Sequence, residues 1–410
     1  MNPHRAGTAH PMGEPTASLR LQSAILIGRG AMNELRAILD ELAGGRADDD
    51  SAVLATVVRV LGSAYRGVGA RRLVARDGEA IGLVSGGCLE ADVARQAWRL
   101  PEGGAAAVIR YDSSGPGGDW AFSLGCQGTV DILVERLDGA DAPPWVDFLR
   151  GRLDRHEPSV LARVLRVEPG EARARVGSFL ALGLDGAIVH DLGTPGLVGS
   201  VAAAARNALD PGRSGHTVLD GVAIVLEVVE PPPTLIVCGA GPDALPVVRL
   251  AAELGWHVAV VDGRHRPATR QRFVAAAEVL TLAELDRMRV LAARPRAAAV
   301  VMTHNVAEDE AFLGPLLASP AAYVGLLGPR HRAERLLGGL GPLAAAARGR
   351  LHAPVGLDLG AETPAEIALA ILAEIQATFA GRDGGSLRGR DRPIHDRPVF
   401  QPTGAVAASG

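Results

Sequence analysis

The chain has 410 residues, with 42 Lys and Arg against 46 Asp and Glu, which gives a formal net charge of −4. At about 150 residues per domain, this length predicts two or three domains with full-sized cores. Hydrophobic residues make up 48% of the sequence and charged residues 21%, which excludes a wholly disordered chain. The balanced charge excludes the simplest type of nucleic-acid-binding protein, because no excess of cations is available to replace phosphate counterions.

Three cysteines in a chain of this length indicate reduced thiols in a cytoplasmic protein rather than a disulfide framework. Residues 1–17 lack the apolar stretch of a secretory signal, and no window reaches the roughly 18 uncharged apolar residues of a membrane span. We therefore expect neither a nucleic acid nor a membrane as partner. Disordered tails are predicted over residues 1–17 and 382–410, because neither segment has a hydrophobic period.

Before Pro231-Pro232-Pro233, residues 18–230 predict one α+β domain. Apolar runs with β-branched residues indicate strands, and apolar residues spaced by three and four indicate helices. The predicted strands are Val53–Val60, Arg71–Arg76, Ala80–Val84, Ala106–Tyr111, Thr129–Arg136 and Ser159–Val167. The predicted helices are Met32–Leu42, Leu89–Leu100 and Val198–Leu209. Asp77-Gly78 predicts a tight hairpin turn with positive φ at both central residues.

After those prolines, residues 231–381 predict a Rossmann-like parallel-sheet domain. The strand Thr234–Cys238 runs into Gly239-Ala240-Gly241, a helix follows to Leu254, and the next strand, His257–Val261, ends at Asp262. This order is the dinucleotide-binding fingerprint. Its glycines let the backbone approach a phosphate at the N-terminus of the helix, and the terminal acid would accept a hydrogen bond from a ribose hydroxyl.

Two residues weaken the case for a bound dinucleotide. Asp243 places a carboxylate in the loop that would hold a pyrophosphate, and Pro246 removes an N–H early in the helix. The repulsion is relieved if Asp243 points outward as a helix cap. NAD(P) binding therefore stays open at this point.

Further strands, Ala297–Met302 and Ala321–Leu327, extend the predicted sheet. Because ligands lie beyond the carboxyl ends of parallel strands, one group of residues is expected to face a shared opening. These residues are Gly239, Asp262, Thr303, His304 and Arg330. The last helix begins at the capping box Thr363–Glu366 and ends at Gly381. One face is expected to be buried through Ile367, Ile371, Ile375 and Phe379.

Three loops carry the remaining candidate chemistry. Gly62–Ala70 combines glycines with Ser63 and Arg66, which suits an anion such as a phosphate or a pterin, although a flexible loop with a solvated arginine is the alternative. In Ser85–Glu90, the thiol of Cys88 precedes a helix, where it would be reactive or metal-binding, or else a small buried hydrophobe.

The other candidate side chains are less informative. Cys126 lies in a glycine-rich loop, and Cys238 is predicted to belong to the core. The cysteine spacing indicates no zinc site. His304 could be an acid, a base, a ligand or a hydrogen-bonded structural residue. No set of catalytic residues emerges from the sequence.

Taken together, several of these segments resemble the XdhC/CoxI family of accessory factors for molybdenum hydroxylases. They keep the family's order over roughly residues 50–380. The matching segments are Ala55–Arg59, Gly62–Ala70, Ser85–Glu90, Leu124–Gly128, Cys238–Gly241, Thr303–Asn305, Ala322–Gly328 and His352–Asp358. Two positions depart from the pattern: Tyr65 replaces a common Pro, and Gly328-Pro329 replaces a Gly-Ser pair.

The resemblance implies a non-catalytic chaperone that binds the molybdenum cofactor, in its molybdopterin form with or without a linked nucleotide. It implies that the protein supports sulfuration of the cofactor with a cysteine desulfurase and then delivers it to an apo-molybdenum hydroxylase. The expected cofactor-binding residues are Ser63, Arg66, Gly86, Gly87, Cys88, Cys126, Gly239, Gly241, Asp262, Thr303, His304 and Arg330, with Cys88 also a metal ligand.

Three interpretations remain open: this chaperone, an NAD(P)-dependent oxidoreductase, and a cofactor-free docking adaptor. A homodimer is expected only because dimers are the commonest oligomers.

Overall fold

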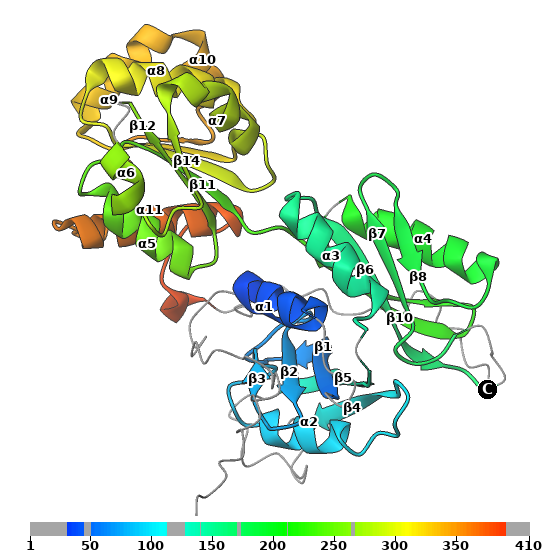
Figure 1. Cartoon of the computed structure of the whole chain (residues 1–410). Coiled ribbons are helices and arrows are strands. Elements are labelled where there is room, and N and C mark those ends of the chain that lie inside the picture. Colours follow the sequence, from blue (N-terminus) through cyan, green and yellow to red (C-terminus); the bar gives the residue numbers. More distant parts are fainter. Residues whose placement is uncertain are drawn as a thin grey trace, which may run out of the picture.

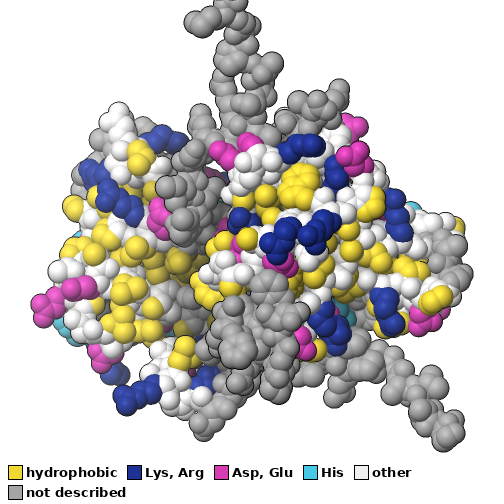
Figure 2. All heavy atoms as spheres, turned by 90° about the horizontal axis from the view of Figure 1, so that it is seen from below, with side chains coloured by type: hydrophobic (Ala, Val, Ile, Leu, Met, Phe, Trp, Pro, Cys, Tyr) yellow, Lys and Arg dark blue, Asp and Glu magenta, His cyan; other side chains and the backbone are white. Residues whose placement is uncertain are grey.

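The structure, a computed structural model, describes residues 31–44, 51–112, 128–139, 141–169, 174–210, 212–263 and 267–390. Its strands form three sheets, two of five strands and one of six, with helices packed against them (Figure 1). None of the described helices is long and apolar enough to cross a membrane. On the face shown in Figure 2, the described basic side chains lie in separate groups with acidic and apolar side chains between them.

The first sheet is antiparallel, in the order β3-β2-β1-β5-β4. Its strands are β1 (Ala52–Gly62), β2 (Arg71–Ala75), β3 (Ala80–Ile81), β4 (Ala106–Asp112) and β5 (Gly128–Leu137). The helix α2 (Glu90–Ala97) packs on one face, where Val93 meets Val57 in a buried cluster. Each strand predicted for this region is confirmed, with ends that differ by a few residues.

The turn between β2 and β3 differs from the prediction. Gly78 has a φ of +92°, whereas Asp77 is not in the left-handed region. The predicted turn with two positive φ angles is therefore wrong. Because β2 ends at Ala75, four residues connect the strands, and in such a longer loop a single glycine near its end supplies the reversal.

The second sheet is also antiparallel, in the order β8-β7-β6-β10-β9. Its strands are β6 (Ser159–Val167), β7 (Phe179–Gly183), β8 (Ile188–His190), β9 (Gly215–Leu219) and β10 (Val222–Val229). The helix α4 (Pro195–Leu209) packs on it. A further cluster joins α1 (Ala31–Ala43), α3 (Pro144–Asp154) and both sheets through residues such as Ile38, Leu54, Leu149 and Leu161. The two sheets thus share one core.

The third sheet is parallel, in the order β13-β12-β11-β14-β15-β16. Its strands are β11 (Thr234–Cys238), β12 (His257–Asp262), β13 (Glu278–Thr281), β14 (Ala297–Val301), β15 (Tyr323–Leu326) and β16 (Leu351–His352). When the six strands are numbered from 1 to 6 along the chain, their order in the sheet is 3-2-1-4-5-6, which is that of a doubly wound fold. The predicted Rossmann-like domain is confirmed, and the strand order reverses between β11 and β14.

Helices cover both faces of the third sheet (Figure 1). The helices of this region are α5 (Ala244–Glu253), α6 (Pro267–Arg272), α7 (Leu285–Ala292), α8 (Val306–Ala318), α9 (Arg330–Leu340), α10 (Pro342–Ala346) and α11 (Pro364–Phe379). In α11 the predicted capping box is present, and Ile371 and Ile375 are fully buried. Cys238 is fully buried as predicted, and burial raises the pKa of its thiol.

The predicted tails are described only in part. Residues 1–17 lie outside the described residues, whereas Arg382–Arg390 are described and include a 3₁₀ helix at Leu387–Gly389.

Two histidines meet between the end of α3 and the start of β12. The ring of His156 lies edge-on to that of His257, with 4.7 Å between centroids. Burial, helped by the nearby Arg294 cation, lowers the pKa of His156 to about 4. His257 donates to Glu278 at 2.9 Å, yet burial still lowers its pKa. The folded state therefore favours two neutral rings.

This pair predicts that the fold weakens in mild acid. His156 binds a proton more weakly when folded than when unfolded, so its contribution is complete above about pH 6.5 and is lost as the pH falls toward 4. We expect the melting temperature to drop between pH 7 and pH 5 in scanning fluorimetry. His156→Asn, which tolerates the left-handed φ of 55°, should flatten this drop. His190→Asn, at an exposed position, is the control, and equal pH slopes in all three proteins would contradict the prediction.

Candidate functional site

Two of the predicted loops lie side by side at the end of the first sheet. A Cβ on Gly86 would stand 3.7 Å from the ring of Tyr65, so that ring lies beside the Ser85–Glu90 turn. The start of β5 closes on the same loop, because a Cβ on Gly128 would come within 2.3 Å of the Ser63 carbonyl oxygen. The structure thus groups Ser63, Tyr65 and the Cys88 turn, whereas Cys126 lies outside the described residues.

The Cys88 turn is held by a short hydrogen-bond network. The Glu90 carboxylate accepts from the backbone N–H and the hydroxyl of Ser85, at 2.8 and 2.5 Å. Burial alone would raise the pKa of Glu90, but these hydrogen bonds outweigh burial and lower it. The Ser85 hydroxyl oxygen in turn accepts from the N–H groups of Gly87 and Leu89, both at 3.2 Å. Hydrogen bonds among its own residues therefore stabilise the turn.

The thiol at this turn is accessible. Cys88 is exposed, and its Sγ lies 3.5 Å from the Ser85 hydroxyl. Gly87 has a φ of +111°, and no atom of the described residues lies within 4 Å of where its Cβ would be. Tyr65, 69% exposed, borders the same turn. The turn thus carries an exposed sulfur atom and lies beside an exposed aromatic ring.

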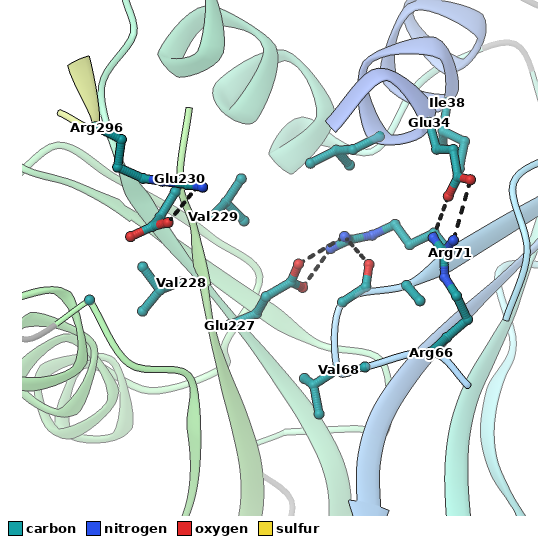
Figure 3. Close-up of a pocket in the computed structure, with 15 residues that line it drawn as sticks. Glu34, Ile38, Arg66, Val68, Arg71, Glu227, Val228, Val229, Glu230 and Arg296 are labelled. Carbon is teal, nitrogen blue, oxygen red and sulfur yellow. Dashed lines mark hydrogen bonds and ion pairs between the residues drawn. The ribbon is translucent and has the colours of Figure 1, made fainter. Parts of the chain in front are cut away.

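A pocket of about 330 Å³ lies behind the glycine loop, lined by α1, residues 66–71, β10 and Arg296. Figure 3 shows how its charged side chains pair. Arg66 is bound by Glu34 of α1, and Arg296 donates to Glu230 at 3.2 Å. An anion that binds Arg66 must therefore compete with the Glu34 carboxylate.

The third ion pair in this pocket joins the two antiparallel sheets. Arg71 of β2 donates two hydrogen bonds to Glu227 of β10, at 2.8 and 2.6 Å, and a third to the Gly69 carbonyl oxygen at 2.8 Å. A Cβ on Gly69 would come within 2.6 Å of the Glu227 carboxylate. The glycine loop is thus pressed directly against the second sheet. Sequence reasoning missed Glu34, Arg71 and Glu227.

The second group of predicted residues lies where the third sheet reverses its strand order. Gly239 follows β11 with a φ of +122°, and a Cβ there would come within 2.6 Å of the Met302 carbonyl oxygen after β14. His304, with a left-handed φ of 59°, donates to Asp243 Oδ2 at 2.8 Å. The loops after β11 and β14 thus meet, as the sequence predicts.

Asp243 does not behave as an outward-pointing cap. It occupies the N-cap position of α5 but makes no capping hydrogen bond, because His304 holds its carboxylate instead. Its buried Oδ1 has no hydrogen-bond partner among the described residues and lies 2.3 Å from where a Cβ of Gly241 would be. The carboxylate therefore lies against the glycine that should admit a phosphate.

The other residues of this group have partners within the protein. Asp262 is buried and accepts from the Thr269 hydroxyl at 2.7 Å. Thr303 donates to Asp309 at 2.6 Å. Arg330 begins α9, largely exposed, with Glu334 one turn away at 3.0 Å. The predicted site residues thus divide between the end of the first sheet and the crevice of the third.

Comparisons with known proteins bear on both groups. Residues 46–112, which include Arg66 and Cys88, match the XdhC and CoxI family, and residues 235–375 match the XdhC Rossmann domain. A Bacillus subtilis protein, named as a probable subunit of xanthine dehydrogenase, is 31% identical over 350 residues, covering 85% of this chain and 98% of that protein. The chain belongs to the XdhC and CoxI family.

Other relatives extend this result. A solved structure of a protein described as a xanthine dehydrogenase from Bacillus halodurans aligns with a TM-score of 0.67 at 28% identity, covering 86% of this chain and 98% of that one. The molybdenum cofactor insertion chaperone PaoD of Escherichia coli is 35% identical over 124 residues, 30% of this chain and 36% of PaoD. The predicted membership of the XdhC and CoxI family is confirmed, and the candidate residues other than Cys126 fall within its matched segments.

Proposed function

We propose that this protein is a maturation factor that binds the molybdenum cofactor, supports its sulfuration and delivers it to an apo-molybdenum hydroxylase of the xanthine dehydrogenase type. The observation that carries the proposal is the exposed thiol of Cys88 in a turn that lies beside the exposed ring of Tyr65, within the segment matched by the XdhC and CoxI family. The name of PaoD, a molybdenum cofactor insertion chaperone, supports the same role. A cysteine desulfurase partner, a homodimer and a cytoplasmic location belong to this proposal.

The residues at the turn fit the chemistry of such a cofactor. A thiolate is a soft ligand that suits molybdenum, and an aromatic ring offers a flat surface to a pterin. Gly87, next to Cys88 in the chain, has no described atom within 4 Å of its Cβ position, which leaves space for a ligand at this turn. Among the described residues, no three His, Cys, Asp or Glu side chains are grouped to hold a metal ion. The cofactor brings its own metal ligands, so we assign Cys88 a holding role rather than a complete metal site.

Arg66 has a different role in this proposal. Its guanidinium, together with Ser63 and the glycine loop, would bind the phosphate of the cofactor after displacing Glu34. Cys126, which lies outside the described residues, stays a proposed contact of the cofactor. The proposed contacts for a linked nucleotide lie at the third sheet and are Gly239, Gly241, Asp262, Thr303, His304 and Arg330. The position of the Asp243 carboxylate argues against nucleotide binding there.

The test is to express the protein in a host that makes molybdopterin and to analyse the desalted product. We expect near-stoichiometric pterin by fluorescence after oxidation, and molybdenum by elemental analysis. Cys88→Ala should lose most of the molybdenum. Tyr65→Ala should weaken pterin binding roughly tenfold, since stacking on an aromatic ring contributes about 1–3 kcal/mol. Tyr65→Phe keeps the ring and is the matched control.

The alternatives give different results in the same experiment. Absence of pterin from the wild-type protein, with a rise in melting temperature on adding NAD(P), would favour an oxidoreductase. Absence of both, with activation of the client enzyme retained, would favour a docking adaptor. If Cys88→Ala and Tyr65→Ala retain the wild-type content of metal and pterin, the Cys88 turn does not bind the cofactor.

A further inference from the structure

A second pocket lies between the two antiparallel sheets. It has a volume of about 560 Å³, within the range of small-molecule sites. Strands from both sheets line it, with Asp131 of β5 among them. The helix α2 packs against the side chains of Ile132 and Val134. Because side chains alternate along a strand, Asp131 faces away from α2 and from the Cys88 turn. The pocket is therefore separate from the site proposed above.

The charged residues that line the pocket are mostly cationic. They are Arg59, Arg110, Asp131 and Arg166, together with His216. Arg110 binds both oxygens of Asp131, at 2.7 and 2.9 Å. Arg166 is exposed and makes no ion pair with any residue that the structure describes. Arg166 therefore brings a guanidinium group beside the Arg110–Asp131 pair, and guanidinium groups suit the oxygens of a phosphate monoester.

His216 holds the pocket together rather than adding charge. Its Nε2 lies 2.7 Å from the Val58 carbonyl oxygen, so this nitrogen carries the proton and joins β9 to β1. Burial lowers the pKa of His216, which keeps the ring neutral at neutral pH. The two sheets are thus fixed to each other at the wall of the pocket, and the arginines approach from both.

The remaining lining is apolar. Val108, Leu165 and Val218 form a hydrophobic wall, and Val218 is 39% exposed. Inorganic phosphate would use the arginines and leave this wall in water. A ligand with a flat ring attached to its phosphate would cover the wall and pair with the arginines at the same time.

We infer that this inter-sheet pocket binds an organic phosphate monoester, with its phosphate on Arg110 and Arg166 and its ring on the wall formed by Val108, Leu165 and Val218. The inference goes beyond the proposed function, because it uses none of the residues around Cys88. The proposed anion site needs residues from both antiparallel sheets.

The test compares AMP, adenosine and inorganic phosphate by isothermal titration calorimetry on the full chain. AMP should bind at least tenfold more tightly than either of the others. Arg166→Glu should weaken AMP binding at least tenfold, and Val218→Glu should also weaken it by placing a carboxylate on the wall. Arg206→Glu on α4 makes the same charge change at another exposed position and should leave AMP binding unchanged.

Each alternative result overturns the inference. Equal affinities for AMP and inorganic phosphate would show that the ring makes no contact in the pocket. Equal affinities for AMP and adenosine would show the same for the phosphate. AMP binding that survives Arg166→Glu and Val218→Glu would lie elsewhere. All of these substitutions are at exposed positions, and melting temperatures would verify that the variants fold. Bound pterin, measured separately, tests the proposed function, so the two can fail independently.

Discussion

Arg71→Met is expected to lower the free energy of unfolding of the two antiparallel sheets by about 3–5 kcal/mol, because it leaves the carboxylate of Glu227 without its partner in a buried position. The side chain of Arg71 is 3% exposed and that of Glu227 is 11% exposed. The pair is bidentate and joins β2 to β10, so neither charge can regain water while the sheets stay packed. Urea unfolding followed by circular dichroism measures the loss.

The double variant Arg71→Met/Glu227→Leu separates the pair's net contribution from the cost of an orphaned charge. Replacing both partners with apolar side chains should recover much of the stability that the single variant loses. Arg289→Met breaks an exposed pair with Asp286 and should leave the unfolding midpoint unchanged. If Arg71→Met unfolds at the same urea concentration as Arg289→Met, the buried pair contributes nothing and the expectation is wrong.

Asp243→Asn and Asp243→Gly are expected to create affinity for ADP in the crevice of the third sheet. The carboxylate lies against Gly241 at the N-terminus of α5, where a diphosphate would otherwise bind. Two like charges about 4 Å apart repel by about 1 kcal/mol in water and about 4 kcal/mol near a protein surface. Removing the charge should therefore tighten ADP binding by roughly tenfold or more, and Asp243→Gly also removes the bulk.

The measurement belongs in an Arg166→Glu background, so that the inter-sheet pocket does not contribute. Asp286→Asn removes a carboxylate from an exposed position and is the control for net charge. ADP binding to the Asp243 parent as tight as to its variants would show that this carboxylate does not exclude diphosphates. That result would also restore the oxidoreductase as a candidate.

Local patterns predicted much of the fold. Ser159–Val167 and Thr234–Cys238 form strands with the predicted ends, because both are short segments rich in apolar and β-branched residues. The crevice after β11 and β14 was also predictable, since parallel strands end on one edge of a sheet. Strands such as β9 and helices such as α3 were missed, because their short or mixed patterns gain stability mainly from the core they join.

The pairing of charges could not be predicted in the same way. Arg71 and Glu227 are 156 residues apart, and no spacing rule relates them. The sequence indicated that Asp243 would disturb a phosphate site, but only the folded chain shows that His304 crosses from the neighbouring loop to hold it. Likewise, Arg66 is a cation in a glycine loop by sequence, and its pairing with Glu34 depends on where α1 packs. Tertiary geometry decides each of these contacts.

The close fit of Gly69 against Glu227 ties the glycine loop to the joint between the two sheets. The Gly69 N–H donates to the Val57 carbonyl oxygen at 2.8 Å, and the Gly69 carbonyl oxygen accepts from Arg71. A ligand that draws Arg66 away from Glu34 moves the loop that contains Gly69. It would therefore also change the geometry of the Arg71–Glu227 ion pair. Ligand binding to the loop and the packing of the two sheets are then thermodynamically linked. By reciprocity, a partner that binds the second sheet changes the affinity of the loop for its ligand.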